Sequence, residues 1–202
     1  MAKAFQRKAD EMATAGILLA AGRGTRFGAD KLAAPLFGRP LAHYAAQALR
    51  TARMDLLFCV GRPITDFVQV SSQGEQADSL RAGIRAARNA GAARAVIVLA
   101  DMPLVTAGLI DRVVAACPPG GAAAAWDRRP MPPTCFDAAL FTNLERIEGD
   151  AGARGILAGL PQEYRVAAPG LLIDIDRPAD LQLLSETHRM AGDGTLRPAP
   201  AP

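Results

Sequence analysis

The stretch that decides the fold is 19–31, which reads LAAGRGTRFGADK and continues the apolar run 15–19. The apolar run predicts a buried strand, and the glycines after it allow a turn whose backbone N–H groups approach an anion. Arg23, Arg26 and Lys31 add positive charge, the arginines as planar forks and the lysine as a point charge. A strand, a glycine-rich turn and cations in this order predict a loop that holds phosphates.

Two common phosphate-binding motifs do not fit this stretch. The ATPase P-loop has four residues between its first glycine and Gly-Lys-Ser/Thr, whereas five residues separate Gly22 from Gly28 and no lysine follows directly. The dinucleotide pattern Gly-x-Gly-x-x-Gly is interrupted because Phe27 occupies its last position. The remaining alternative is a strand-to-helix turn whose cations are merely solvated.

Lys31 stands out among the basic residues. The chain has 23 lysines and arginines, and only three of them are lysines. The other two, Lys3 and Lys8, lie in a polar N-terminal leader, so Lys31 is the only lysine of the expected folded body. This usage indicates that a compact ammonium group is needed at this position.

Composition limits the class of protein. The 202 residues suffice for one domain with a substantial core, and half of them are hydrophobic. The net charge of +3 comes with arginines scattered along the chain, which predicts no nucleic-acid partner and suits small anionic substrates. No apolar run reaches the ~20 residues that cross a bilayer, so we expect no membrane partner. Three cysteines without Cys-x-x-Cys spacing and two distant histidines predict no local metal cluster and a reduced, cytoplasmic location.

The pattern along the chain predicts one domain between two tails. We expect a flexible leader over 1–14, a single domain over 15–191 and a disordered tail over 192–202. Predicted strands cover 15–19, 56–60, 95–99, 122–126 and 171–175. Predicted helices cover 41–53, 78–89, 105–117, 138–147, a short segment after residue 154 and a closing segment through residue 189. Alternating strands and helices predict an α/β fold, with a mainly parallel sheet covered by helices on both faces.

Carboxylates follow two of the predicted strands, at the sheet edge where such folds bind ligands. Asp101 follows the apolar strand 95–99 and is well placed to hold Mg²⁺; capping of the next helix is the alternative. Asp176 follows the last predicted strand, and we favour it over Asp174 as a second metal ligand because it lies nearer the strand end. The alternative is that both aspartates simply bracket the turn at Pro178.

Other polar residues suggest ligand contacts without a nucleophile. Asp150 and Arg154 lie in a glycine-rich turn that opens a short helix, where Arg154 either grips an anion or pairs with Asp150. Ser79, in the first turn of the helix 78–89, either bonds a ligand or caps its helix. No Gly-x-Ser-x-Gly motif is present, and Cys135 has no base near it in sequence. This set favours direct transfer between two bound substrates.

Together these motifs resemble those of the nucleotidyltransferases. Residues 19–31 resemble the signature loop of that family. The chain is most similar to the MobA-like group, and within it to the molybdenum cofactor cytidylyltransferase branch. Four further segments match in the right order, namely 74–83, 100–105, 149–154 and 174–181. The matching segments span nearly the whole expected domain.

The resemblance implies a three-layer α/β/α fold with a Rossmann-like, mainly parallel but mixed sheet, of the nucleotide-diphospho-sugar-transferase type. It implies Mg²⁺-dependent transfer of CMP from CTP to the phosphate of a molybdopterin-type cofactor, with release of pyrophosphate. By this resemblance Arg26, Lys31 and Asp101 are catalytic, and Asp101 and Asp176 hold Mg²⁺. The residues implied to contact the substrates are Leu19, Ala20, Ala21, Gly22, Arg23, Gly24 and Ser79 on the nucleotide side, and Asp150 and Arg154 on the acceptor side.

Base and acceptor have alternatives. Ala21 favours CTP, because guanylyltransferases of this group tend to carry glycine there. The first alternative is the same chemistry with GTP or another NTP and a different phosphorylated acceptor. The second is a non-catalytic carrier that escorts the cofactor to a molybdoenzyme. Gly24 and Phe27 replace the Ser and Met usual in the branch. The segment 130–133 stands where a Gly-x-Pro acceptor loop is usual, so acceptor identity is less defined than the nucleotidyl step.

Overall fold

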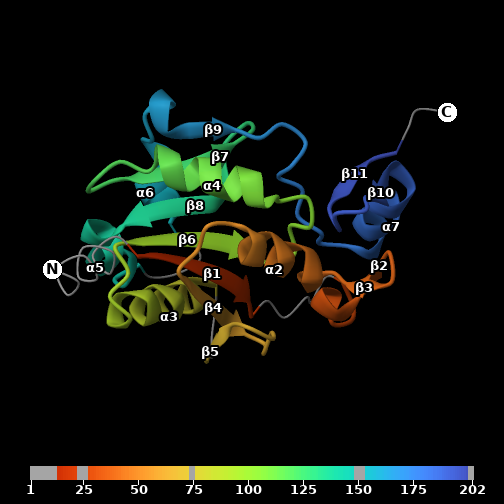
Figure 1. The fold of residues 1–202 in the computed structure, drawn as a ribbon, viewed down its shortest axis with the longest axis horizontal. Coiled ribbons are helices and arrows are strands. Elements are labelled where there is room, and N and C mark those ends of the chain that lie inside the picture. Colours follow the sequence, from red (N-terminus) through yellow and green to blue (C-terminus); the bar gives the residue numbers. More distant parts are fainter. Residues whose placement is uncertain (1–12, 22–26, 73–75, 148–152, 200–202) are drawn as a thin grey trace, which may run out of the picture.

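A seven-stranded sheet forms the centre of the molecule, in the order β5-β4-β1-β6-β8-β7-β9. The computed structural model describes residues 13–21, 27–72, 76–147 and 153–199. The strands of this sheet are β1 (Thr14–Ala20), β4 (Leu56–Gly61), β5 (Val68–Val70), β6 (Arg94–Leu99), β7 (Ala122–Trp126), β8 (Pro130–Asp137) and β9 (Arg165–Ala167). β8 runs antiparallel to both of its neighbours, and the other pairs are parallel (Figure 1). The expected mainly parallel, mixed sheet is confirmed.

Helices cover both faces of the sheet and complete the three layers (Figure 1). The helices are α2 (Ala42–Thr51), α3 (Gln76–Asn89), α4 (Ala107–Ala116), α5 (Phe141–Leu144), α6 (Arg154–Ala158) and α7 (Pro178–Thr187). Short 3-10 turns are η1 (Lys31–Ala33), η2 (Ala138–Leu140) and η4 (Gln162–Tyr164). Two small hairpins pair β2 (Pro35–Leu36) with β3 (Arg39–Pro40), and β10 (His188–Met190) with β11 (Leu196–Pro198). None of the described helices is long and apolar enough to cross a membrane.

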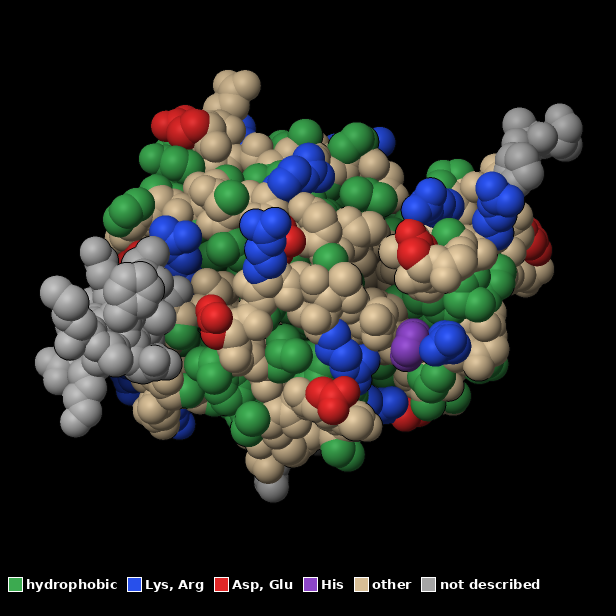
Figure 2. Space-filling view, viewed as in Figure 1, with side chains coloured by type: hydrophobic (Ala, Val, Ile, Leu, Met, Phe, Trp, Pro, Cys, Tyr) green, Lys and Arg blue, Asp and Glu red, His purple; other side chains and the backbone are tan. Residues whose placement is uncertain are grey.

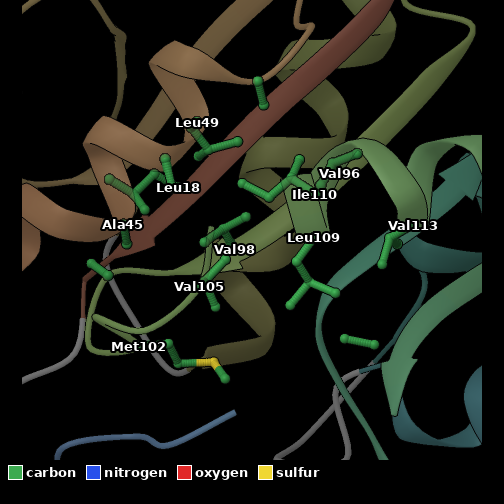
Figure 3. Packing of buried hydrophobic residues seen from close by; sticks show 14 of the residues in the cluster. Leu18, Ala45, Leu49, Val96, Val98, Met102, Val105, Leu109, Ile110 and Val113 are labelled. Carbon is green, nitrogen blue, oxygen red and sulfur yellow. The ribbon is translucent and has the colours of Figure 1, made fainter. Parts of the chain in front are cut away.

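The strands β1 and β6 are almost entirely apolar because helices bury both of their faces. Side chains alternate between the faces of a strand, so Leu18 of β1 and Val98 of β6 pack with α2 and α4 on one side (Figure 3). Ile17 and Ile97 pack on the other side, in the cluster that contains buried residues of α3, α5 and α6. These continuous apolar runs are the sequence signal of a sheet covered on both faces.

β8 is the element that the sequence pattern missed most clearly. Its segment begins with prolines, which cannot donate to a ladder and normally argue against a strand. The structure places Pro132 and Pro133 at an irregularity of the β7–β8 pairing, where the register jumps from Ala124↔Thr134 to Ala125↔Met131. The prolines therefore occupy the positions that need no ladder hydrogen bond. The three-residue strands β5 and β9 were too short to show a pattern.

The predicted strand 171–175 is wrong. The described chain there is an extended connection without strand pairing, and its apolar residues reflect burial of Leu172 and Ile175. The predicted helix 138–147 is shorter than expected, since it consists of η2 followed by one turn of α5. The expected leader lies outside the described residues up to residue 12, and Thr14 already belongs to β1.

The predicted tail 192–202 differs from the structure as far as residue 199. Leu196–Pro198 form β11, and β11 pairs with β10. Leu196 is buried in a cluster with Leu184 of α7, Tyr44 of α2 and Ile175. Figure 1 shows α7, β10 and β11 beside β2 and β3, at one end of the sheet. Tertiary burial of one leucine therefore orders a segment whose composition is typical of disorder.

Figure 2 shows acidic and basic side chains scattered over one face of the molecule, without a continuous basic stripe.

Candidate active site

The carboxyl ends of β1, β4 and β6 lie level with one another. Ala20 of β1 is opposite Gly61 of β4 in the parallel register, and the N–H of Ala100 donates to the carbonyl of Leu19 at 3.0 Å. Neighbouring strands are only about 4.8 Å apart. The beginning of the glycine-rich stretch and Asp101 are therefore brought to the same edge of the sheet, where α/β folds bind their ligands.

Lys31 lies where these strand ends meet. It begins η1, whose start is capped by Asp30, because the Asp30 carboxylate accepts a hydrogen bond from the N–H of Leu32 at 3.2 Å. The side chain is nearly buried, and its Nζ donates to Oδ2 of Asp101 at 2.6 Å and to Oδ1 of Asp176 at 3.2 Å. One ammonium group thus joins two carboxylates from separate parts of the chain. We call Lys31, Asp101 and Asp176 the Lys31 group.

The backbone of Ile175 completes the surroundings of the ammonium. Nζ of Lys31 also donates to the carbonyl of Ile175 at 3.1 Å, so three oxygens surround it. The N–H of Ile175 donates to the carbonyl of Asp101 at 3.0 Å, which ties the connection to the strand end. Sequence reasoning missed Ile175, because it acts through its backbone and its side chain is fully buried.

Asp176 is held in place by Asp180 rather than by a strand. The Asp180 carboxylate accepts hydrogen bonds from the N–H groups of Asp176 at 3.0 Å and Arg177 at 2.7 Å. An acidic residue in the first turn after Pro178 is a known signal of a helix start, so the sequence did carry evidence for this role. Of the two aspartates weighed as metal ligands, Asp176 faces Lys31, whereas Asp174 is exposed.

The charge of Lys31 is stabilised by its neighbours. Burial by itself lowers the pKa of Lys31, because it disfavours the charged form. Hydrogen bonds and charge attraction from Asp101, and then from Asp176, outweigh burial and raise the pKa above its ordinary value. Lys31 therefore stays positively charged at neutral pH. It donates hydrogen bonds but does not act as a general acid or base.

The carboxylates fit a divalent cation. Oδ1 of Asp101 is buried and has no hydrogen-bond partner among the described residues, which is costly unless another group approaches it. Asp101 and Asp176 direct carboxylate oxygens toward the same point, the position of Nζ. Mg²⁺ is usually held by one or two carboxylates together with phosphate oxygens and water. Within the described ranges no group of three or more His, Cys, Asp or Glu side chains could hold a metal.

The other predicted site residues are not part of the Lys31 group. Ser79 is buried in the first part of α3 and donates to Oγ of Ser72 at 3.2 Å. Arg154 begins α6 and its side chain is exposed. Asp101 does not cap the following helix, since Thr106 accepts the N-cap hydrogen bond of α4. Five predicted residues lie outside the described ranges, namely Gly22, Arg23, Gly24, Arg26 and Asp150.

The same fold occurs in a solved nucleotidyltransferase. The structure is similar to a nucleotidyl transferase from Methanothermobacter thermautotroptrophicus (Mth528), with a TM-score of 0.75, 20% identity and coverage of 86% of this chain and 96% of that one. It is also similar to Rv0371C from Mycobacterium tuberculosis H37Rv, solved as a complex with manganese, with a TM-score of 0.69, 23% identity and coverage of 87% and 98%. These two likenesses support the fold.

The family follows from the sequence match. Residues 16–166 match the MobA-like NTP transferase domain, so the chain belongs to the MobA-like family of nucleotidyltransferases. It is 32% identical over 201 residues to "Probable molybdenum cofactor guanylyltransferase" from Mycobacterium avium, covering 89% of this chain and 99% of that protein. It is 27% identical over 195 residues to "Purine catabolism protein PucB" from Bacillus subtilis, covering 84% and 94%. The resemblance drawn from the motifs is confirmed at the level of this family.

Proposed function

We propose that the chain transfers GMP from GTP to the phosphate of a molybdopterin-type acceptor and releases pyrophosphate. The observation that carries the proposal is the Lys31 group, in which one lysine and two carboxylates meet at the strand ends beside the glycine-rich stretch. A triphosphate needs both positive charge and a metal-binding carboxylate within reach, and this edge of the sheet supplies both.

Each residue of the Lys31 group has a separate task. Lys31 has three N–H donors and would exchange a present oxygen partner for a phosphate oxygen, offsetting charge on the triphosphate. Asp101 and Asp176 would hold Mg²⁺. The bound ion supplies neutralisation of the charge that develops on the leaving pyrophosphate. The Asp180 carboxylate holds Asp176, and the N–H of Ile175 holds the backbone of Asp101, in place for metal binding.

The transfer itself needs no protein nucleophile. An oxygen of the acceptor phosphate attacks the α-phosphorus of the NTP, and the bond from that phosphorus to the bridging oxygen of pyrophosphate breaks. The product is a dinucleotide with a new phosphoanhydride bond, and the electron pair of the broken bond leaves on pyrophosphate. The three cysteines of the chain are buried, which agrees with a mechanism that uses no thiol.

GTP is preferred over the CTP expected from the sequence because of the relatives. The protein from Mycobacterium avium, which this chain matches over nearly its whole length, is named a guanylyltransferase. CTP is the second candidate, and the observation that favours it is Ala21, which stands at the end of β1 beside the strand edge. One methyl group in a binding site is worth about 1–3 kcal/mol. Ala21 by itself therefore favours CTP less strongly than the match to the named guanylyltransferase favours GTP.

The decisive experiment measures pyrophosphate release with GTP, CTP, ATP and UTP, each against metal-loaded molybdopterin and a panel of phosphorylated sugars, alditols and small acids. Mg²⁺ and Mn²⁺ are compared in parallel. We expect the highest kcat/KM for GTP with molybdopterin. Turnover with only another NTP would contradict GTP as the donor. Turnover with only another acceptor would contradict molybdopterin as the acceptor.

A matched pair of variants separates an enzyme from a non-catalytic carrier. Asp101→Asn should lower kcat by about 100-fold or more, since removal of a single electrostatic stabiliser typically has this effect. Asp111→Asn is the control, because the Asp111 carboxylate accepts one hydrogen bond, from the N–H of Arg53 at 2.9 Å, outside the Lys31 group. A carrier would deliver cofactor to its client equally well with either variant.

A further inference from the structure

The end of β4 contacts both described ends of the glycine-rich stretch. Gly61 closes β4 and packs against Ala20 and Ala21, where the stretch begins. Arg62 follows directly and pairs with Asp30, the residue before Lys31. We infer that Gly61 and Arg62 are positioning residues for nucleotide binding, which set where the stretch leaves β1 and where it delivers Lys31. This inference deepens the proposed function and depends on it.

Gly61 allows a close approach that no other residue permits. Its φ is +108°, in the region that favours glycine. A Cβ at this position would lie 2.6 Å from Cα of Ala21 and 2.7 Å from the carbonyl carbon and oxygen of Ala20. These are backbone atoms, so they could yield only if the chain itself moved. The carbonyl of Gly61 also accepts a hydrogen bond from Nε2 of Gln69 at 2.5 Å, which holds the β4 end from the other side.

Arg62 anchors the opposite end of the stretch. Its guanidinium forms an ion pair with Oδ2 of Asp30, while Oδ1 of Asp30 caps η1 through the N–H of Leu32. The hydrogen bond from Arg62 lowers the pKa of Asp30, so the cap stays charged at neutral pH. The carbonyl of Arg62 accepts from the buried thiol of Cys59 at 3.2 Å, which restrains the backbone of the arginine.

These contacts form a chain of alternating charges across the strand ends. Arg62 pairs with Asp30, and the next residue along, Lys31, pairs with Asp101 and Asp176. Asp30 and Lys31 are consecutive, so a shift of Asp30 moves the base of the Lys31 side chain. A displacement of about 1 Å at a binding group is enough to lower activity strongly. Arg62 and Gly61 therefore act through the stretch and through Lys31, without needing to touch the reacting atoms.

The β4 end contacts both described ends of the stretch through independent contacts, one steric and one ionic.

The test measures the Kd of each NTP for the 202-residue chain in the presence of Mg²⁺, together with the melting temperature. Gly61→Ala and Arg62→Gln should each raise the Kd of the NTP that binds the wild type by about tenfold or more. Arg62→Lys keeps the charge and should recover part of the loss. Each variant is compared with the same kind of substitution at a residue outside the stretch.

Two controls separate positioning from general destabilisation. Gly91→Ala has the same kind of backbone strain, with φ of +78°, but its Cβ would have no neighbour within 4 Å. Arg50→Gln removes another arginine that pairs with an aspartate, Asp66, at 3.4 Å. We expect Gly91→Ala to lower the melting temperature less than Gly61→Ala does, because it adds backbone strain without a clash, and we expect both controls to leave the Kd unchanged.

The outcomes are distinguishable. A raised Kd in Gly61→Ala and Arg62→Gln, with an unchanged Kd in both controls, supports the inference. Wild-type affinity in both variants overturns the inference and leaves the proposed function standing. Equal losses of affinity in variants and controls also overturn it, since the effect would then follow stability. A wild-type chain that binds none of the four NTPs overturns the proposed function and this inference together.

Discussion

Nζ of Lys31 lies 2.6 Å from Oδ2 of Asp101, although the two residues are 70 positions apart in the chain. Both groups are largely buried, with side-chain exposures of 10% and 17%. Asp176 contributes a second carboxylate to the same ammonium, so the group holds one positive and two negative charges. Two carboxylates that converge on one point are a reason for this site to attract a metal cation.

The first prediction concerns the shape of the Lys31 cation. Lys31→Arg should lower kcat by about 100-fold, because a planar guanidinium does not place a single point charge among three oxygens as an ammonium does. Steady-state kinetics with the preferred NTP measure the effect. The control is Lys8→Arg, the same exchange at another lysine of the chain, which should leave kcat unchanged. Full activity of Lys31→Arg would contradict the argument drawn from the rare use of lysine.

The second prediction concerns competition between Lys31 and metal. Lys31→Met should bind Mn²⁺ more tightly than the wild type when nucleotide is absent, because Nζ now stands where the two carboxylates converge. Removing that charge leaves two carboxylates without their shared counter-ion, so a cation gains affinity. Electron paramagnetic resonance of free Mn²⁺ gives the Kd. Asp101→Asn should have the opposite effect, and weaker binding in Lys31→Met would sink the idea.

The third prediction concerns the base. Ala21→Gly should change the ratio of kcat/KM for GTP to that for CTP by no more than about 200-fold, since one methyl group in a binding site is worth about 1–3 kcal/mol. We expect GTP to be preferred in both the wild type and the variant. Competition assays with both nucleotides present measure the ratio directly. An inversion of preference on removal of this methyl would show that Ala21 selects the base.

The fourth prediction concerns the C-terminal elements. Leu184→Ala should lower the free energy of unfolding by about 2–5 kcal/mol, because Leu184 is only 3% exposed and packs with Ile175. Its neighbour Leu183 is 61% exposed, so Leu183→Ala should change stability by less than about 0.5 kcal/mol. Urea unfolding monitored by circular dichroism compares the two. Equal losses of unfolding free energy in the two variants would contradict the argument that burial of Leu184 against Ile175 stabilises the fold.

The fifth prediction concerns thiol reactivity. Burial raises the pKa of Cys59 to about 11, and its thiol donates to the carbonyl of Arg62. The reactive thiolate is therefore scarce at pH 8, and its population grows only as the pH approaches 11. Iodoacetamide at pH 8 should leave Cys59 unmodified in the native chain and label it after unfolding in urea, as mass spectrometry would show. Rapid native labelling would mean that the β4 end opens readily.

Much of the fold was predictable from local pattern. The apolar runs of β1 and β6 are buried on both faces, and such runs are visible without any knowledge of neighbours. The expected strand 122–126 coincides with β7. β8 was not predictable, because its prolines look like a loop until the irregular pairing with β7 provides positions that need no donor. Gln162–Tyr164 and β9 were missed because they are only three residues long.

The site was predictable only in part. Asp101 could be proposed from the sequence because it follows an apolar predicted strand, and Lys31 because it ends the glycine-rich stretch. The carbonyl of Ile175 carries no side-chain signal, and the expected strand 171–175 is an extended connection. The ordered β10–β11 hairpin was hidden by a composition typical of a disordered tail, since the burial of Leu196 depends on residues far away in the chain.

The sequence by itself determined the alternation of strands and helices, the apolar layers and the kinds of charge at the strand ends, because these depend on the local periodicity and chemistry of each segment. Only the tertiary structure decided that Lys31 joins Asp101 and Asp176, and that Gly61 and Arg62 meet the two ends of the glycine-rich stretch. Such contacts depend on strand register and on burial between distant segments, and no local pattern encodes a distance between residues that are remote in sequence.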